Sequence, residues 1–378
     1  MIRDPARYSP RDLPAMIGTM VCMAPKFVRP HIRQMDGYTP GEQPGAGERV
    51  VKLNTNENPY PPSPRVMQAI REIEPEVLRR YPSPTAESFR KAAAKILGVE
   101  KDMILAGNGS DDLLTIATRT FIASAGTLAY PEPTYSLYPI LAQLADARSI
   151  TVEWGGDWSL PIESLAATKA DAIFLANPNA PSGTFVPPTE VAKLAEQFNG
   201  LLLIDEAYVD FAESNCLSLV SKYPNVMVTR SFSKAYSLAG LRFGYAVAQP
   251  AVIHEMMKVK DSYNCDAISA AAAAAAMEDQ EYAARSWNHV KGERARLTEE
   301  LRQLGWSVLP SQANFILATC PGGRGHETYL GLKRQGILVR FFDKPGLTDK
   351  IRITIGTSQE NNALLGGLKE LSASEKAA

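Results

Sequence analysis

The chain has 378 residues, 45% of them hydrophobic, and a formal net charge of −1 from 40 basic and 41 acidic residues. This length suggests about two or three domains. The balanced charge gives no electrostatic support for binding to nucleic acid or to an anionic membrane. No apolar run approaches the roughly 18 uncharged residues that a membrane-spanning helix requires.

Residues 1–45 are rich in Pro, Gly and Arg and are expected to form an N-terminal arm. They lack the basic-then-apolar order of a secretory signal. The cysteines and histidines are far apart in the sequence, so neither a metal site nor a disulfide framework is expected, and a reducing cytoplasm is the expected compartment. The four cysteines are Cys22, Cys216, Cys265 and Cys320.

The first two thirds of the chain predict an alternation of strands and helices. Ser63 and Pro64 are typical of a helix start, and Gly98 is typical of a helix end. Such alternation indicates a mostly parallel sheet covered by helices, whose ligands gather at the carboxyl ends of the strands. Strands are expected at 50–53, 103–106, 127–130, 170–176, 201–204, 226–230 and 244–248, and helices at 64–73, 86–97, 113–121 and 188–198.

The alanine run 270–276 predicts a helix, and the polar stretch 281–304 predicts a long helix that leads to a second domain. We therefore expect an α/β fold with a large domain at 86–289 and a smaller α+β domain made of 46–85 and 290–378. The elements expected after the long helix are strands at 306–309, 315–318, 338–341 and 351–354, and helices at 326–335 and 359–371.

Lys234 lies in the hydroxyl-rich turn Ser231-Phe-Ser-Lys that follows an expected strand. A lysine amine can condense with an aldehyde to form a Schiff base, and pyridoxal phosphate enzymes require such a lysine together with a carboxylate and phosphate-binding donors. Alone, Lys234 could be a surface lysine. Because Asp205 and Arg242 lie nearby in the sequence, we interpret Lys234 as the lysine that carries pyridoxal phosphate.

Asp205 ends an apolar strand, where a carboxylate is costly unless it is paired. A protonated pyridine nitrogen is a suitable partner, and a helix cap is the alternative. Tyr208, three residues later, could donate to the ring oxygen of the cofactor or could simply pack. Tyr135 follows another strand and could stack on the ring, although core packing is a strong alternative.

Gly107-Asn-Gly109-Ser110-Asp111 lies between a strand and a helix, where glycines admit close approach and backbone N–H groups can bind phosphate. Ser231, Ser233 and Arg242 could supply further donors. Asn179, in the turn 177–183, could offer its amide to the ring oxygen. Arg352 and Arg340 each lie in an apolar strand and could bind the anionic end of a substrate, the alternative being a structural ion pair.

Together these segments resemble the fold-type I pyridoxal-phosphate-dependent aminotransferases, and within them most closely the histidinol-phosphate aminotransferases. The resemblance covers about residues 28–371. It rests on the motifs Leu53-Asn-Thr-Asn-Glu-Asn-Pro-Tyr60, Arg80-Tyr-Pro82, Gly107-Asn-Gly-Ser-Asp-Asp112, Asn177 to Gly183, Ile204-Asp-Glu-Ala-Tyr208, Ser231-Phe-Ser-Lys-Ala-Tyr236 and Ile351-Arg-Ile-Thr-Ile-Gly356.

The resemblance implies a role for each of these residues. Lys234 carries the cofactor, Asp205 pairs with its ring nitrogen, Tyr208 meets its hydroxyl and Tyr135 stacks on its ring. Its phosphate is surrounded by Gly109, Ser110, Asp111, Ser231, Ser233 and Arg242, and also by Tyr81 of the second subunit of a homodimer. The substrate is held by Arg340, Arg352, Asn58 and Tyr60.

One position departs from the family pattern. The family usually has asparagine directly before the second proline of the turn, where this chain has Ala180. Either Asn179 substitutes for that asparagine, or the ring oxygen depends on Tyr208.

The resulting hypothesis is a cytoplasmic homodimeric aminotransferase that converts histidinol phosphate and 2-oxoglutarate into imidazole-acetol phosphate and glutamate. The reaction would be ping-pong through a Lys234 aldimine. The alternatives are an aminotransferase for aromatic amino acids, a phosphothreonine decarboxylase, and a non-catalytic protein that binds a small molecule. The chain has no Walker-type loop, so a non-catalytic protein that binds a nucleotide has no support from the sequence.

Overall fold

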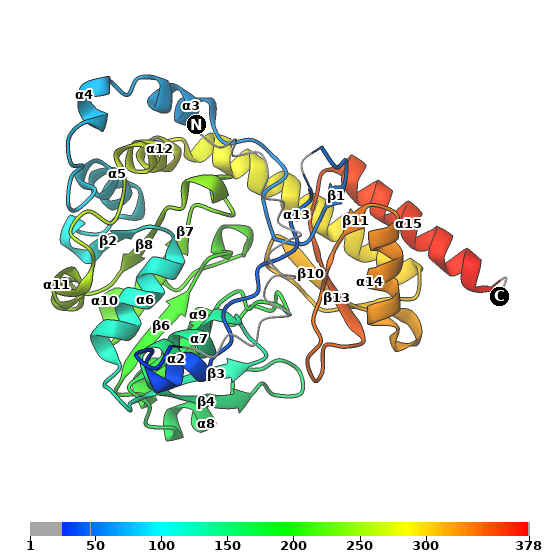
Figure 1. Cartoon of the computed structure of the whole chain (residues 1–378), viewed down its shortest axis with the longest axis horizontal. Coiled ribbons are helices and arrows are strands. Elements are labelled where there is room, and N and C mark those ends of the chain that lie inside the picture. Colours follow the sequence, from blue (N-terminus) through cyan, green and yellow to red (C-terminus); the bar gives the residue numbers. More distant parts are fainter. Residues whose placement is uncertain (1–24, 46, 377–378) are drawn as a thin grey trace.

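The computed structural model describes residues 25–45 and 47–376 and has two lobes (Figure 1). The large lobe contains a seven-stranded sheet and the small lobe a four-stranded sheet. A 24-residue helix, α13 (Gln280–Gln303), runs from one lobe to the other. Cys22 and the part of the expected arm before residue 25 lie outside the described residues.

The large sheet has the strand order β2-β8-β7-β6-β5-β3-β4. Strand β8 is antiparallel to both of its neighbours, and the other pairs are parallel, so the mostly parallel sheet expected from the sequence is confirmed. The strands are β2 (Ile104–Gly107), β3 (Thr127–Glu132), β4 (Arg148–Glu153), β5 (Ala172–Ala176), β6 (Leu201–Asp205), β7 (Val226–Ser231) and β8 (Gly244–Val247).

Helices cover both faces of this sheet, and successive strand residues therefore enter two different cores. Leu202 and Ile204 belong to one cluster, whereas Leu203 and Phe174 belong to the other. This alternation follows from the two-residue period of a strand. The helices of the large lobe are α5 (Glu87–Leu97), α6 (Ser110–Phe121), α7 (Leu137–Leu144), α8 (Ile162–Ala167), α9 (Pro188–Gln197), α10 (Leu217–Lys222), α11 (Pro250–Val259) and α12 (Ala267–Glu278).

In the small lobe, the antiparallel strands β12-β13-β10-β9 form one sheet, and β1 pairs in parallel with β11. Helices α14 (Gly325–Arg334) and α15 (Ser358–Lys376) pack beside it (Figure 1). Its strands are β1 (Val51–Lys52), β9 (Ser307–Val308), β10 (Phe315–Thr319), β11 (Ile337–Leu338), β12 (Arg340–Phe341) and β13 (Lys350–Thr354).

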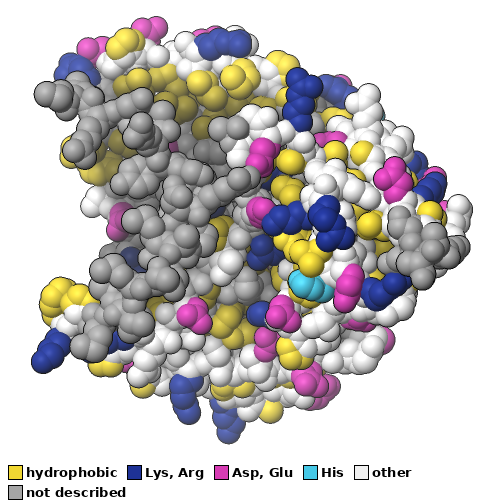
Figure 2. Space-filling model, turned by 45° about the vertical axis from the view of Figure 1, so that its right-hand side comes forward, with side chains coloured by type: hydrophobic (Ala, Val, Ile, Leu, Met, Phe, Trp, Pro, Cys, Tyr) yellow, Lys and Arg dark blue, Asp and Glu magenta, His cyan; other side chains and the backbone are white. Residues whose placement is uncertain are grey.

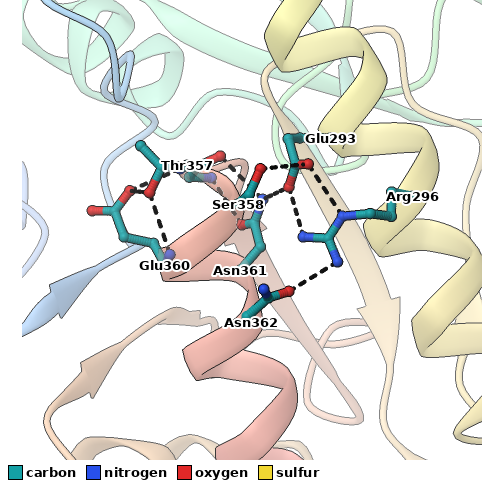
Figure 3. Close-up of polar contacts among 8 residues, drawn as sticks. Glu293, Arg296, Thr357, Ser358, Glu360, Asn361 and Asn362 are labelled. Carbon is teal, nitrogen blue, oxygen red and sulfur yellow. Dashed lines mark hydrogen bonds and ion pairs between the residues drawn. The ribbon is translucent and has the colours of Figure 1, made fainter.

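A carboxylate on α13 joins this helix to the start of α15 (Figure 3). Glu293 accepts hydrogen bonds from Arg296 at 2.7 Å, from Ser358 at 2.9 Å and from Asn361 at 2.8 Å. These donors, Arg296 first, lower the pKa of Glu293 to about 2. The network therefore fixes the segment that directly follows β13.

The N-terminal segments connect the two lobes. Helix α2 (Pro30–Gln34) packs against α7 of the large lobe, whereas Glu42 pairs with Lys333 on α14 at 2.8 Å. Helix α3 (Pro64–Arg71) packs against α12, and α4 (Pro75–Leu78) follows it. The division into domains at 46–85, 86–289 and 290–378 stays a prediction.

Several sequence expectations need correction at their boundaries. Helix α6 begins at Ser110 rather than at residue 113, because the two aspartates after Ser110 occupy the first turn. The expected strand 338–341 is two short strands in different sheets, separated at Val339, because β11 pairs with β1 while β12 pairs with β13. The N-cap role of Ser63 is confirmed, since its side chain accepts from the N–H of Arg65 at 3.1 Å.

Basic and acidic side chains are interspersed on the face drawn in Figure 2, outside the part in grey. This agrees with the balanced composition of the chain.

Candidate active site

The chemically important side chains gather at the carboxyl ends of the parallel strands, on the side that faces the small lobe. Asp205 is the last residue of β6, Ser231 is the last residue of β7, and Lys234 follows in the next turn. The turn 177–183 follows β5, and Tyr135 follows β3. This edge is where open α/β sheets bind their ligands.

Lys234 is half-buried and donates from Nζ to the carbonyl oxygen of Thr55 at 3.0 Å. Burial, with a contribution from the charge of Arg352, lowers the pKa of Lys234 to about 8. A lysine in this state is partly neutral near pH 7 and can act as a nucleophile or as a base.

Asp205 is 4% exposed and has only neutral partners among the described residues. The hydroxyl of Tyr138 donates to Oδ2 at 3.1 Å, the N–H of Ala207 donates to Oδ1 at 3.2 Å, and Thr229 lies at 3.5 Å. Burial, assisted by the charge of Asp111, raises the pKa of Asp205 to about 7. A cationic group placed beside this carboxylate would restore its ionised form.

A cradle for an anion surrounds the start of α6. Gly109 has a φ of +89°, and a Cβ atom on it would lie 2.8 Å from Nη2 of Arg242. Gly244 is equally confined, since its Cβ would lie 2.6 Å from the backbone nitrogen of Ser110. Glycines at these two positions therefore let the arginine and the helix start approach each other. Arg242 donates to Oγ of Ser233 at 2.9 Å, and Oγ of Ser231 accepts from the N–H of Ser233 at 3.1 Å.

Asp111 and Tyr135 are joined inside this region. The hydroxyl of Tyr135 donates to Oδ1 of Asp111 at 3.2 Å, and Nη2 of Arg242 lies 3.4 Å from Oδ2. The carboxylate of Asp111 is thus engaged with two donors, and its backbone N–H, at the start of the helix, is the group suited to an anion. The ring of Tyr135 contacts those of Tyr138 at 5.7 Å and Tyr38 at 6.3 Å.

Asn179 is buried and its amide is engaged within the loops. Nδ2 donates to the carbonyl oxygen of Pro133 at 3.1 Å and to Oγ of Ser182 at 2.9 Å. Oδ1 accepts from Thr134 at 2.8 Å. Ala180 beside it packs in an apolar cluster with Ala313, Phe315 and Tyr208. The predicted contact of Asn179 with a ring oxygen therefore stays a prediction, and these bonds weaken its basis.

Arg340 and Arg352 are direct partners across the pair β12–β13. Arg352 donates to the carbonyl oxygen of Asn54 at 3.0 Å, but its buried Nε has no hydrogen-bond partner in the described part of the chain. Arg340 donates to the carbonyl oxygens of Thr39 at 3.3 Å and Pro40 at 3.4 Å. Like charges on opposed strand positions destabilise a sheet, so this pair favours an anionic ligand over the structural ion pair considered above.

Asn58 and Tyr60 lie at the boundary between the site and α13. Nδ2 of Asn58 donates to the carbonyl oxygen of Ala235 at 3.2 Å and to Ser286 at 3.0 Å. Nε1 of Trp287 donates to the same carbonyl oxygen at 2.8 Å. Ala235, which carries this oxygen, directly follows Lys234 in the chain. Tyr60 packs against His289 with ring centroids 5.5 Å apart. These contacts hold the backbone next to Lys234 in place.

Tyr81 is an exposed residue of the segment that follows α4. Its side chain is 81% exposed and stacks on Tyr263 with ring centroids 4.5 Å apart. Val77 and Leu78 on the neighbouring α4 are also exposed. The exposed ring of Tyr81 thus has one face against Tyr263 and is otherwise open to a partner.

Comparison with known proteins follows this geometry. Residues 48–368 match the family described as aminotransferase class I and II. The chain belongs to this family. It is 46% identical to histidinol-phosphate aminotransferase 1 of Trichormus variabilis over 345 residues. This aligned region covers 91% of this chain and 99% of the relative. It is 47% identical over 340 residues to histidinol-phosphate aminotransferase of Rhodopirellula baltica, with coverage of 89% and 93%.

A solved structure shares the fold of this aminotransferase. The histidinol-phosphate aminotransferase from Sinorhizobium meliloti, determined in complex with pyridoxal-5'-phosphate, superposes with a TM-score of 0.84 at 26% identity. The match covers 93% of this chain and 99% of that chain. The resemblance to fold-type I aminotransferases and the expected α/β fold are thereby confirmed.

Three residues of the aminotransferase site carry no role in the sequence analysis. Tyr138 donates to Asp205, Asn56 donates from Nδ2 to the hydroxyl of Tyr208 at 3.0 Å, and Thr55 accepts from Lys234. The asparagine-rich motif at 53–60 was the sequence pattern that could have indicated Asn56. Tyr138 is separated from Asp205 by 67 positions, so only the folded chain reveals its contact.

Residues 25–45 and 47–376 contain neither a membrane-spanning helix nor a cluster of metal ligands. Helices in this part of the chain are too short or too polar to cross a bilayer. The same residues contain no group of three or more His, Cys, Asp or Glu side chains suited to a metal ion.

Proposed function

We propose that this aminotransferase transfers the amino group of histidinol phosphate to 2-oxoglutarate, giving imidazole-acetol phosphate and glutamate in histidine biosynthesis. The observation that carries the proposal is that the carboxyl ends of the neighbouring strands β6 and β7 bring the buried Asp205 together with Lys234 and with the serine that Arg242 contacts. The names of the two relatives supply the substrate.

The residues fit pyridoxal phosphate. Asp205 has neutral partners and a raised pKa, so it suits a cationic pyridine nitrogen. The glycine-lined start of α6 and the guanidinium of Arg242 suit a doubly charged phosphate. Lys234 has the lowered pKa that condensation with an aldehyde requires. When bound, the cofactor supplies an electron sink that stabilises negative charge on the substrate carbon.

Each of these residues then has a task. Asp205 keeps the ring nitrogen protonated, and the aromatic face of Tyr135 holds the ring in its plane. Tyr208 donates its hydroxyl hydrogen to the ring oxygen. Lys234, as a neutral amine, would take the proton from the substrate Cα and pass it to the cofactor carbon that receives the amino group. The lowered pKa of Lys234 keeps a useful fraction of this base neutral near pH 7.

Arg352 and Arg340 bind the anionic end of the substrate. The free Nε of Arg352 and the adjacent charge of Arg340 attract a phosphate or a carboxylate, and both substrates of the proposed reaction carry such a group. Asn58 and Tyr60, in the loop whose Asn54 accepts from Arg352, would border the same space. Tyr208 lies close enough to Arg352 for the positive charge to act on its pKa.

The active unit in this proposal is a cytoplasmic homodimer. The exposed side chains of Val77, Leu78, Tyr81 and Tyr263 form an apolar aromatic surface that would be covered by the second subunit. Tyr81 would then reach the phosphate site of the partner rather than its own. Residues 86–289 would form the cofactor-binding domain, with 46–85 and 290–378 as the smaller domain.

The test is a substrate panel followed by absorbance of the purified protein loaded with pyridoxal phosphate. Histidinol phosphate should discharge the absorption band of the bound cofactor faster than phenylalanine does, and 2-oxoglutarate should restore it. A preference for phenylalanine would instead indicate an aromatic aminotransferase, and carbon dioxide release from phosphothreonine a decarboxylase. Lys234→Ala, the matched control, should show neither the band nor turnover. Unchanged transfer in this variant would show that Lys234 does not carry the cofactor, and no transfer by the unmodified protein would favour a non-catalytic protein that binds a small molecule.

A further inference from the structure

Asn56 lies in the turn between β1 and α3, and it links both lobes at the site. It is 2% exposed and has a φ of +56°, a conformation that asparagine tolerates better than most residues. Its carbonyl oxygen accepts from Nδ2 of Asn314 at 2.9 Å. Because its backbone is confined and satisfied in this way, the direction of its side-chain amide is set by the remaining partners.

Thr354, on β13, determines which way that amide faces. The backbone N–H of Asn56 donates to Oγ1 of Thr354 at 2.9 Å. The Thr354 hydroxyl in turn donates to Oδ1 of Asn56 at 3.1 Å. Because the amide oxygen is turned toward Thr354, Nδ2 faces Tyr208 and donates to its hydroxyl oxygen at 3.0 Å.

This order of donors leaves the hydroxyl hydrogen of Tyr208 available. The oxygen of Tyr208 already accepts from Asn56, so its own hydrogen must seek a different acceptor. The ring of Tyr208 is fixed edge-on against Phe315, with centroids 5.0 Å apart and planes at 84°, and Nζ of Lys234 lies 5.9 Å from its centroid. The ring of Tyr208 and the reactive amine of Lys234 therefore lie beside each other.

Other groups around Tyr208 do not replace this donor. Ala180, which packs in the same cluster, has no polar side chain, and the amide of Asn179 is engaged by Pro133 and Ser182. The charged and titratable groups around Tyr208 include Arg352, Asp205 and Lys234, and the tyrosines Tyr38, Tyr135 and Tyr138. A ring oxygen placed here would depend on Tyr208 for its hydrogen bond from this side.

We propose that Asn56, aligned by Thr354, is a positioning residue that directs the hydroxyl hydrogen of Tyr208 to the ring oxygen of bound pyridoxal phosphate. The inference rests on the proposed function. It extends that function to Asn56 and Thr354, which would act on the cofactor through Tyr208 and not by direct contact. A donor to that oxygen stabilises its anionic form and lowers the pH at which the bound chromophore loses its proton.

The test compares pH titrations of the absorption band in the loaded protein. Asn56→Asp keeps the shape of the side chain, but its carboxylate accepts the hydroxyl hydrogen of Tyr208 and withdraws it from the cofactor. We expect the apparent pKa of the band to rise by about one unit, a tenfold change in the equilibrium, as in Tyr208→Phe. Equilibrium dialysis of pyridoxal phosphate against the same variants gives a second readout, with weaker binding expected.

Thr354 supplies a matched pair of variants. Thr354→Val removes the hydroxyl that orients the amide and should shift the band in the same direction, whereas Thr354→Ser retains the hydroxyl and should titrate as the unmodified protein does. Thermal unfolding of each variant identifies any that fail to fold. If either Asn56→Asp or Thr354→Val is unfolded, the titration of the other variant tests the proposal. An unchanged titration in folded Asn56→Asp and Thr354→Val would overturn the proposal.

The double variant Asn56→Asp with Tyr208→Phe separates positioning from a direct effect of the new charge. If Asn56 acts through Tyr208, the double variant should titrate like Tyr208→Phe alone. A further shift in the double variant would overturn the proposal, because it would show that the carboxylate acts without the tyrosine. If the unmodified protein acquires no band, the proposed function fails and this inference fails with it.

Discussion

Tyr138 donates its hydroxyl hydrogen to Oδ2 of Asp205 across 3.1 Å in the core of the large lobe. Tyr138 is fully buried on α7, and its ring packs against those of Phe174 and Tyr130. The carboxylate therefore has a fixed direction before any ligand binds. A neutral hydroxyl compensates the burial of Asp205 only in part, and the pKa of Asp205 remains raised to about 7.

This burial makes Asp205 a source of instability in the cofactor-free protein. The unfolded chain releases the proton near pH 3.8, whereas the folded chain holds it to about pH 7, so the unfavourable contribution grows between these values and is complete above them. A difference of roughly three pKa units corresponds to at most about 4 kcal/mol. Asp205→Asn should raise the unfolding temperature of the cofactor-free protein, and more at pH 8 than at pH 5.5.

The same variant should bind pyridoxal phosphate more weakly, since it cannot pair with a cationic ring nitrogen. Calorimetry without cofactor and dialysis with it measure the two opposite effects. Tyr138→Phe is the counterpart, because removal of the donor raises the pKa of Asp205 further and should lower stability at pH 8. Equal gains of stability in Asp205→Asn at both pH values would contradict the explanation.

Lys234 predicts the pH dependence of cofactor capture. Only the neutral amine attacks an aldehyde, so the rate at which cofactor-free protein captures pyridoxal phosphate should rise about tenfold per pH unit below the pKa. It should level off above about pH 8, the pKa of Lys234 set by burial and by Arg352. Stopped-flow absorbance measures this profile. Arg352→Gln should move the profile to higher pH and Arg352→Lys should not; an inflection near the ordinary lysine value would refute the assignment.

Glu293 makes a stability prediction that is independent of the cofactor. Its folded-state pKa is lowered to about 2 by Arg296, Asn361 and Ser358, so its contribution is present above the unfolded value of 4.5 and is lost as the pH falls through about 2. Glu293→Gln should lower the free energy of unfolding by about 1–3 kcal/mol at pH 7, measured in denaturant.

The matched control lies on the same helix. Glu281 pairs with Arg285 at 2.7 Å, but its side chain is 88% exposed. Such exposed pairs contribute little, so Glu281→Gln should leave unfolding nearly unchanged. Similar losses in both variants would mean that helix propensity or net charge, rather than the network of Figure 3, determines the effect.

The placement of Tyr81 can be tested by mixing two inactive variants. Lys234→Ala lacks the reactive amine, and Tyr81→Ala lacks the exposed ring. If Tyr81 serves the partner subunit, a mixed dimer regains one complete site, and a random mixture should recover up to about a quarter of full activity. Differently tagged subunits and purification of the mixed species give the measurement. No recovery in a verified mixed dimer would place Tyr81 outside the partner's site.

Much of the fold could be predicted because its central strands are short apolar runs. Strands β5, β6 and β7 are buried along their whole length, as expected of strands covered on both faces. The edge strand β4, Arg148–Glu153, was not predicted although Ile150 and Val152 alternate with polar residues, because only these two of its six residues are apolar and none is buried. Helix α7 was also missed: its eight residues include Pro139 and follow a proline-rich turn, and the side chain of Ser136 at the N-cap makes no capping hydrogen bond.

For the site, the sequence identified the residues that end strands but not those that support them. Lys234, Asp205 and Arg242 lie in local motifs whose composition indicates their chemistry. Asn56 and Thr354 are 298 positions apart and meet only because β13 lies beside the turn after β1. Such contacts between lobes leave no local pattern in the chain. The exposure of Tyr81 and its stacking on Tyr263 likewise required coordinates.

The bond from Trp287 to the carbonyl oxygen of Ala235 places an indole next to the reactive lysine. An indole emits light in the range that a bound pyridine aldehyde absorbs, and energy transfer between them falls steeply with distance. The fluorescence of Trp287 should therefore report how much of the protein has bound the cofactor. Loading can be followed as quenching of ultraviolet emission, with no label and no second substrate.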